Sequence, residues 1–153
     1  MWVPPEIKDP ILRHAPTRKS VACFGAVSLI TGQFVRMMCA IFNAATFRCF
    51  LKRLLRQKTP GRRMILVLDN ARYHHAVLLT AFLRRHARDL RLLFLPPYSP
   101  QLAPIERVWK LTRRLCLHCR YFENLKDIIS AVEAEFANWT TRNDVLRKLC
   151  AIT

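Results

Sequence analysis

The sequence has 153 residues, of which 52% are apolar, so it can form one domain with a packed core and is not a disordered chain. Its 26 Lys and Arg residues against 10 Asp and Glu residues give a net charge of +16, which favours a polyanionic partner, nucleic acid first. The longest apolar stretch, 21–30, is too short to span a membrane and lacks the flanks of a signal peptide. We therefore expect a cytoplasmic protein with no membrane partner.

The six cysteines fit a reducing compartment and small core positions better than a disulfide framework. Cys116 and Cys119 form a single CxxC around His118, which could begin a zinc site only if a second ligand pair followed. None follows at a suitable spacing. We expect these two cysteines, with Leu115, on the apolar stripe of a helix.

The predicted elements begin after residues 1–19, which are rich in proline and read as an extended lead-in. Apolar runs over 21–30 and 33–40, separated by Thr31 and Gly32, predict a β-hairpin. Residues 43–57 predict an amphipathic basic helix with Asn43 as its cap. The elements predicted after it are a strand over 64–68 buried on both faces, a helix over 75–86, a strand over 91–95, a proline-rich loop over 96–104, and helices over 105–118 and 125–138.

This order predicts one α/β domain over residues 20–153, with a hairpin, a parallel strand pair and helices. Pro104 suits the first turn of the helix over 105–118. The inward stripe of that helix is expected to consist of Ile105, Val108, Trp109 and Leu115.

Two carboxylates occupy informative positions in a sequence with few acids. Asp69 directly follows the apolar strand at its carboxyl end, where α/β sheets place ligands, and Glu106 lies in the first turn of the helix after the proline-rich loop. Paired carboxylates suit Mg²⁺ or Mn²⁺, and two such ions can activate a water or a 3′-hydroxyl during phosphodiester cleavage. We predict Asp69 and Glu106 as the catalytic and metal-binding residues.

Each of these residues also has a structural interpretation. Asp69 could cap a turn together with Asn70, and Glu106 could complement the helix dipole or pair with Lys110. His74 and the histidine after it favour turn or packing roles, although His74 lies near enough in sequence to border the site of Asp69.

Two stretches carry a resemblance to a known family. Residues 66–76 read LVLDNARYHHA, and residues 92–114 read LLFLPPYSPQLAPIERVWKLTRR. A strand ending in Asp-Asn, a nearby His and a PPYSP-x-L-x-PIE-x-x-W block are similar to the core signature of the DDE transposases of bacterial insertion sequences in the mariner superfamily. With the hairpin and the helix after it, the resemblance covers about residues 20–140.

The resemblance implies a ribonuclease-H-like fold, in which helices flank a mixed sheet, and Mg²⁺ or Mn²⁺ as cofactor. It also implies cleavage and strand transfer of DNA at the ends of a mobile element. By position, Asp69 matches the second catalytic Asp of the family and Glu106 its terminal Glu. Ala103 departs from the Asn that is common before Pro-Ile-Glu, so a helix cap is missing there.

The family's first catalytic Asp lies on a central strand that would precede residue 20, after a helix-turn-helix DNA-binding region. Only Glu6 and Asp9 are acidic before Asp69, and both stand among prolines. We therefore expect a truncated or split form without the first central strand, which an upstream transposase fragment could complete. A homodimer and association with the bacterial nucleoid follow from the resemblance alone.

Basic residues gather on two predicted helices, where they would hold phosphate backbone beside the two carboxylates. Three classes of function remain: a DNA-cutting enzyme, a non-catalytic DNA-binding fragment and, least supported, an RNA-binding protein. The predicted DNA-binding residues are Arg48, Lys52, Arg53, Arg56, Arg107, Lys110, Arg113 and Arg114, with Lys58, Arg62 and Arg63 in the turn after the first of these helices.

Overall fold

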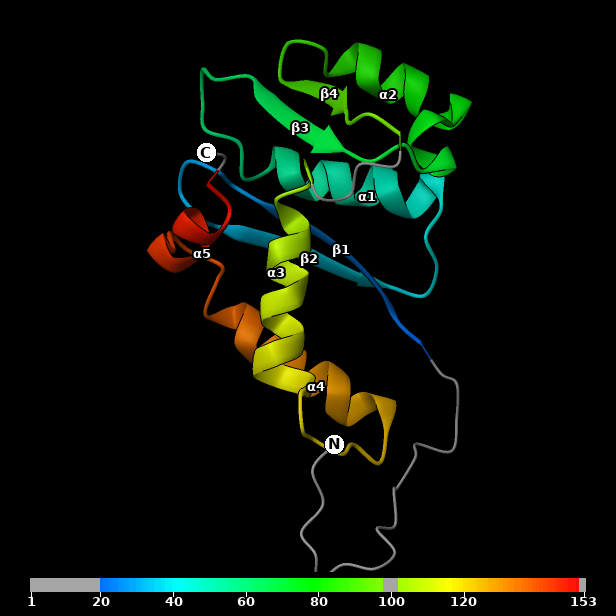
Figure 1. The fold of residues 1–153 in the computed structure, drawn as a ribbon. Coiled ribbons are helices and arrows are strands. Elements are labelled where there is room, and N and C mark those ends of the chain that lie inside the picture. Colours follow the sequence, from blue (N-terminus) through cyan, green and yellow to red (C-terminus); the bar gives the residue numbers. More distant parts are fainter. Residues whose placement is uncertain (1–19, 98–101, 152–153) are drawn as a thin grey trace, which may run out of the picture.

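The computed structural model describes residues 20–97 and 102–151 (Figure 1). The predicted lead-in and part of the proline-rich loop lie outside these ranges. In chain order, the elements are β1 (Ala22–Val27), β2 (Phe34–Cys39), α1 (Ala44–Leu55), β3 (Met64–Leu68), the 3-10 turns η1 (Arg72–His75) and η2 (Val77–Leu79), α2 (Thr80–Arg85), β4 (Leu90–Phe94), α3 (Ile105–Thr112), the π-helical turn η4 (Arg113–Leu117), α4 (Leu125–Ala137) and α5 (Asp144–Leu149). No helix in the described part is long and apolar enough to cross a membrane.

The strands form two separate pairs. β1 and β2 make the predicted antiparallel hairpin, with Val27 opposite Phe34 and Ala22 opposite Cys39. β3 and β4 make the predicted parallel pair, with Leu66 opposite Leu92. Within the described ranges, no strand joins one pair to the other, so the expected mixed sheet is divided into two.

Backbone hydrogen bonds show which edges of these pairs are open. Met64 N–H donates to Asp89 O and Leu95 N–H donates to Leu68 O, both at 2.8 Å, so alternate β3 residues bond to β4 and the backbone groups of Ile65 and Val67 face the other edge. The same alternation in the hairpin turns the backbone groups of three β1 residues away from β2. These three residues are Cys23, Gly25 and Val27.

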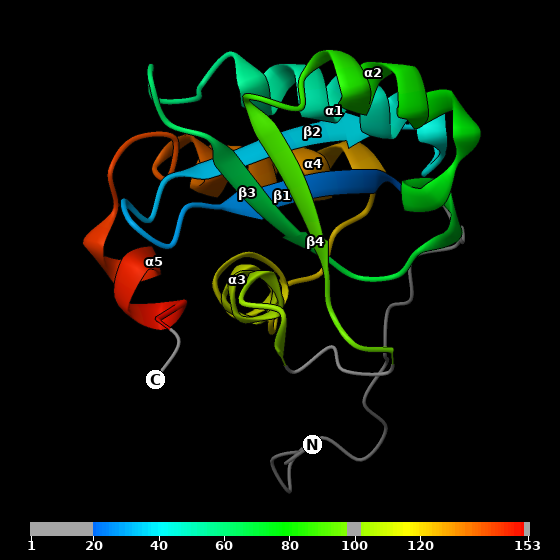
Figure 2. The same cartoon turned by 90° about the horizontal axis from the view of Figure 1, so that it is seen from above.

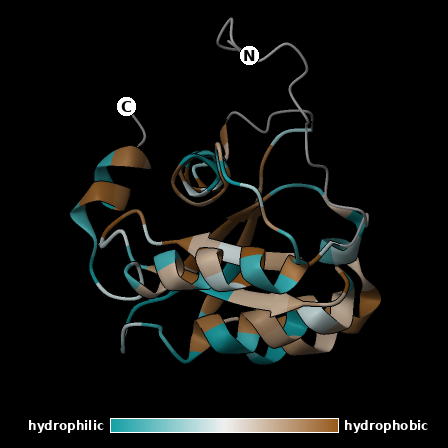
Figure 3. Ribbon diagram, turned by 90° about the horizontal axis from the view of Figure 1, so that it is seen from below, coloured by the Kyte–Doolittle hydropathy of each residue, from teal (hydrophilic) through white to brown (hydrophobic). Residues whose placement is uncertain are grey.

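Helices cover the strands in layers (Figure 2). One face of the hairpin and the inner face of β3–β4 pack against α1 in a cluster that includes Phe24, Phe47, Leu51 and Leu90. The other face of the hairpin packs against α3 and α4 around Phe34, Val108, Phe136 and Trp139. Figure 3 shows hydrophobic residues along the strands between the helices, with hydrophilic residues interspersed along the helices.

The segment after α4 binds the Phe34 end of the outer edge of β2. Phe34 N–H donates to Trp139 O at 2.8 Å, and the Gln33 side chain donates to Thr140 O at 2.9 Å. Asn143 N–H donates to Thr31 O at 2.9 Å, and the Asn143 side chain caps α5. Gly32, with φ +71°, lies so close to this cap that a Cβ there would be 1.8 Å from Asn143 O. The hairpin turn and the start of α5 therefore pack directly against each other and are joined by a hydrogen bond.

Two predicted elements differ in their packing. The strand over 64–68 is not buried on both faces, because Ile65 and Val67 are 61% and 38% exposed on the side away from α1. The helix predicted over 75–86 is reduced to α2, because Ala76 is extended and divides the stretch before it into two 3-10 turns.

The prediction of which residues face inward on the helix over 105–118 is also partly wrong. Ile105, Val108 and Trp109 pack inward, but Leu115 is 43% exposed. The regular helix ends at Thr112 and a π-helical turn follows, which brings Thr112 and Cys116 to the buried side instead.

The prediction that the cysteines are core residues holds for some of them. Cys116 and Cys150 are buried, and Cys23 and Cys39 are half-buried, whereas Cys49 and Cys119 are exposed. Burial raises the pKa of the Cys23 thiol to about 11, with a smaller contribution from Glu133. Cys119 has φ +57° and is not on the apolar stripe, so that part of the prediction was wrong.

The last helix, α5, was not predicted from the sequence.

Candidate active site

Asp69 stands directly after β3, at its carboxyl end, and its side chain is 72% exposed. The carboxylate therefore stays hydrated and accessible to a ligand. Its Oδ1 atom accepts a hydrogen bond from Ala71 N–H at 3.3 Å and lies 3.1 Å from the Nδ1 atom of His74. Both interactions use Oδ1, which leaves Oδ2 to meet a ligand.

His74 orients this carboxylate from a buried position. Its ring is 6% exposed and lies 4.4 Å, centroid to centroid, from the rings of Phe47 and Tyr73. Nδ1 is 3.1 Å from both the backbone oxygen and Oδ1 of Asp69. Because both of these oxygens are acceptors, Nδ1 carries the proton. Burial lowers the pKa of His74, although Asp69 opposes the shift, so the ring acts as a neutral donor.

The Asn70 side chain links the end of β3 to the segment that follows β4. Its side-chain amide donates to Leu95 O, and Leu95 N–H donates to Leu68 O. These bonds hold the two parallel strands together just where Asp69 begins. The predicted turn role is confirmed for Asp69, whose Oδ1 accepts from Ala71 N–H, whereas Asn70 bonds across to the segment after β4.

Glu106 lies in the first turn of α3 and is half-buried. No side chain caps this helix end, as Ala103 led us to expect, and Glu106 N–H donates to Ala103 O at 3.1 Å. Within residues 20–97 and 102–151, Glu106 forms no ion pair with Lys110. The structural interpretation of Glu106 as one half of an ion pair is not supported.

The position of α3 depends on a close approach to β1. Gly25 has no side chain, and a Cβ there would be 2.6 Å and 2.8 Å from two ring carbons of Trp109. Trp109 packs edge-on against Phe34, with 5.7 Å between the ring centroids. This fit sets how near α3, and with it Glu106, comes to the hairpin.

Figures 1 and 2 both place the beginning of α3 beside the end of β3, so the segments carrying Asp69 and Glu106 are neighbours despite their separation in sequence. Carboxylate oxygens are the ligands that Mg²⁺ and Mn²⁺ prefer, so these two side chains are of the chemical type that binds such an ion. Within the described ranges, no group of three or more His, Cys, Asp or Glu side chains could hold a metal. Two carboxylates would leave the remaining positions to water or phosphate oxygens.

The basic residues predicted to bind DNA fall on opposite sides of the strands, because α1 and α3 do (Figure 2). On α1 and its C-terminal end, Lys52, Arg53 and Arg56 are exposed and Arg48 is half-buried. On α3 and the π-helical turn, the exposed cations are Arg107, Lys110, Arg113 and Arg114.

Two of the predicted cations already have partners within the fold. The Arg107 guanidinium donates to Leu149 O at 2.9 Å and to Ala151 O at 2.8 Å, so it holds the end of α5. Lys58 pairs with Asp89 at 3.0 Å and donates to Arg62 O at 3.0 Å. These contacts give both residues a structural role that the sequence did not indicate.

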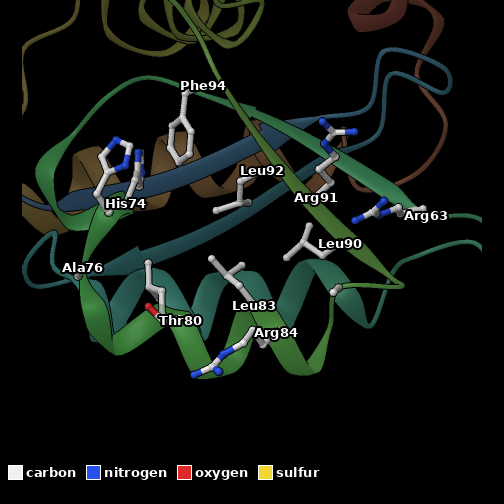
Figure 4. A pocket seen from close by; sticks show the side chains of 13 residues that line it. Arg63, His74, Ala76, Thr80, Leu83, Arg84, Leu90, Arg91, Leu92 and Phe94 are labelled. Carbon is white, nitrogen blue, oxygen red and sulfur yellow. The ribbon is translucent and has the colours of Figure 1, made fainter.

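A hollow of about 500 Å³ adjoins the His74 segment, between β4 and α2 (Figure 4). Its lining combines apolar side chains, such as Leu83 and Phe94, with Arg63, Arg84 and Arg91. No acidic side chain lines it. His75 stacks on Phe94, with 4.3 Å between ring centroids, which confirms a packing role for this histidine.

Comparison with known proteins decides the family. A family model described as DDE superfamily endonuclease matches residues 1–129. This chain belongs to that family. The resemblance to DDE transposases seen in the sequence is thereby confirmed.

Two similar proteins can be named. The uncharacterized protein y4pE/y4sA of Sinorhizobium fredii (strain NBRC 101917 / NGR234) is 30% identical over 107 residues, which are 70% of this chain and 76% of that protein. The crystal structure of the Mos1 strand transfer complex matches 98% of this chain with a TM-score of 0.68 and 21% identity. This DDE-family chain spans only 44% of the Mos1 chain. The match confirms the ribonuclease-H-like fold class.

Proposed function

We propose that this DDE-family chain is catalytic machinery of a transposase, which cuts DNA strands at mobile-element ends and transfers them to a target. The observation that carries the proposal is the placement of two carboxylates, Asp69 at the end of β3 and Glu106 in the first turn of the neighbouring α3. The family match supports it, because its description is that of an endonuclease.

In this proposal, Asp69 and Glu106 hold Mg²⁺ or Mn²⁺. When bound, such ions activate a water or a 3′-hydroxyl and stabilise the leaving oxygen of a phosphodiester. His74 is a positioning residue, because its Nδ1 proton keeps Oδ1 of Asp69 engaged while Oδ2 stays available. The cations of α3 and of the π-helical turn offset the negative charge that DNA brings to the two carboxylates.

We further propose that another strand completes the sheet between the open edges of β1 and β3. The backbone groups of Cys23, Gly25, Val27, Ile65 and Val67 face these edges without a ladder partner in the described ranges. A strand at an open edge gains main-chain hydrogen bonds on both sides. An upstream segment of the transposase, in the same or a separate polypeptide, would suit this place and could bring a third acid. A homodimer and nucleoid association stay proposals as well.

A specific observation favours a second candidate, a non-catalytic DNA-binding transposase fragment. Two carboxylates are fewer than a well-held pair of metal ions needs, and the described part has no group of three His, Cys, Asp or Glu side chains that could hold a metal. The basic surfaces would still bind DNA in such a fragment.

One experiment separates the candidates. Mn²⁺ binding, followed by the electron paramagnetic resonance signal of free Mn²⁺, and nicking of supercoiled plasmid are measured for the wild type, Asp69→Asn and Glu106→Gln. Glu123→Gln, which removes an exposed acid elsewhere, is the matched control. We expect Mn²⁺ binding that both site variants lose and the control keeps. Equal Mn²⁺ binding in all four proteins would overturn the site, whereas binding without nicking would favour the DNA-binding fragment.

A further inference from the structure

A second hollow, of about 330 Å³, lies between α1 and α2. Two of its side chains come from successive turns of α1, Arg48 and Lys52, and two from the end of α2, Arg85 and His86. Ala81 and Phe82 complete the lining, and no acidic side chain takes part. We call this hollow the α1–α2 pocket.

In the ranges that the structure describes, the cations of the α1–α2 pocket have no counter-ion. The ion pairs of the described ranges join Arg36 to Glu133, Lys58 to Asp89, His74 to Asp69, and Arg142 and Arg147 to Asp144. Asp89 is close in sequence to the pocket, but it is already paired with Lys58 at 3.0 Å. The side chains of two arginines and one lysine thus line one hollow, which repels other cations and attracts an anion.

Arg48 adds a second observation at this pocket. Its Nε atom is buried and has no hydrogen-bond partner, and it is the one such side-chain atom in the described part of the chain. A buried donor without an acceptor is costly, because it has lost its hydration and gained nothing in return. Because this atom has almost no accessible surface, an acceptor in the pocket would restore the bond once the Arg48 side chain turned toward it.

We propose that the α1–α2 pocket binds a phosphate group. Phosphate offers several acceptor oxygens, which a planar guanidinium can engage through two N–H groups at once, and the Lys and second Arg would neutralise its charge. Figure 2 shows α1 and α2 on one side of the strands and α3 on the other, so this pocket is separate from the proposed site of strand cleavage. The phosphate could belong to DNA or to a free phosphate or polyphosphate, whose chemistry is the same.

The test uses sodium pyrophosphate as the probe. Binding is measured by isothermal titration calorimetry on the full chain, with sodium chloride keeping the ionic strength constant. We expect one pyrophosphate for each chain, and Arg48→Met should weaken binding by about 10- to 100-fold, the effect of losing a hydrogen bond to a charged group. Arg88→Met, which removes an exposed cation outside the pocket, should bind as the wild type does. If Arg48→Met does not fold, Lys52→Met replaces it, because Lys52 is exposed.

Two results would overturn the proposal. The first is equal pyrophosphate affinity in the wild type and in both pocket variants. The second is a loss in Arg84→Met without a loss in Arg48→Met, because Arg84 lines only the larger hollow beside β4.

A duplex-DNA titration distinguishes the two sources of phosphate. If the phosphate is that of DNA, Arg48→Met should reduce the slope of log affinity against log salt by about 0.9, and pyrophosphate should compete with the duplex. If the pocket takes free phosphate, the slope stays unchanged while pyrophosphate binding is lost. Either result supports the pocket, and neither depends on catalysis at Asp69 and Glu106.

Discussion

Replacing Gly25 by alanine should push α3 away from the hairpin. The added Cβ would meet the Cη2 and Cζ2 atoms of Trp109 at 2.6 Å and 2.8 Å, and a ring carbon of Phe34 at 2.9 Å. Carbon atoms in contact normally lie about 3.5–4.0 Å apart, so each neighbour would have to move by roughly 1 Å. Phe34 is fully buried, which leaves it little room to do so.

The size of the effect follows from the cost of overpacking. Forcing a methyl group into a filled core costs about 1–3 kcal/mol, and the three short contacts place Gly25→Ala near the middle of that range, at about 2 kcal/mol. For a chain of this length, such a loss lowers the melting temperature by about 4–8 °C.

Urea and thermal unfolding of Gly25→Ala, Trp109→Leu and the double variant test this reasoning. The smaller leucine should give space for the new methyl group, so the double variant should lose less stability than the sum of the single losses, with a coupling of at least about 0.5 kcal/mol. Gly61→Ala is the control for coupling, because Gly61 has φ +73° but open space around it. Strictly additive losses for Gly25→Ala and Trp109→Leu would refute the close contact.

Three further predictions concern a buried histidine, a helix cap and the basic surface. Because burial lowers the pKa of His74 below its usual 6.5, the unfolded chain binds this proton more readily than the folded chain does. The free energy of unfolding in urea should therefore fall as the pH drops below about 6.5, and it should fall less for His74→Asn. An equal pH dependence in the two proteins would contradict this reasoning. Asn43→Ala removes the capping box of α1 and should cost about 1 kcal/mol, whereas Asn124→Ala, at a helix start with no side-chain cap bond, should cost less in the same assay. Affinity for duplex DNA, measured by fluorescence anisotropy, should fall with a log–log slope of about 0.9 for each phosphate contact, and Arg113→Ala with Arg114→Ala should flatten it; an affinity that salt does not change would exclude this role.

Most of the fold could be predicted where the local pattern and the packing agree. The hairpin, α1 with its Asn43 cap and the parallel pair follow from apolar periodicity and turn residues, and they occur as predicted. Periodicity could not reveal that Ile65 and Val67 lie exposed, because an apolar run reads the same whether or not a layer covers its second face. It also could not reveal the π-helical turn, which moves Leu115 outward after Thr112.

The sequence was enough to propose Asp69 and Glu106 as site residues, a role that stays a prediction, but it could not indicate which residues contact them. Asp69 and Glu106 stood out because acids are few and both occur at element ends. The contact of His74 with Asp69 depends on a 3-10 turn that returns the chain to the strand end, and no periodic pattern indicates such a turn. Arg107 reads as one more basic residue in sequence, because its partner Leu149 is distant along the chain.

The contact between the hairpin and the segment that leads into α5 has a consequence for synthesis on the ribosome. Gln33 and its partner Thr140 are 107 positions apart. At a translation rate of about 5–20 residues per second, roughly 5–20 s pass between the synthesis of Gln33 and that of Thr140. The Phe34 end of β2 stays uncovered during this time. During that interval the nascent hairpin presents strand edges to any other nascent chain nearby, and unpaired strand edges promote association. Residues 139–143 thus act as a late closure of the Phe34 end of β2.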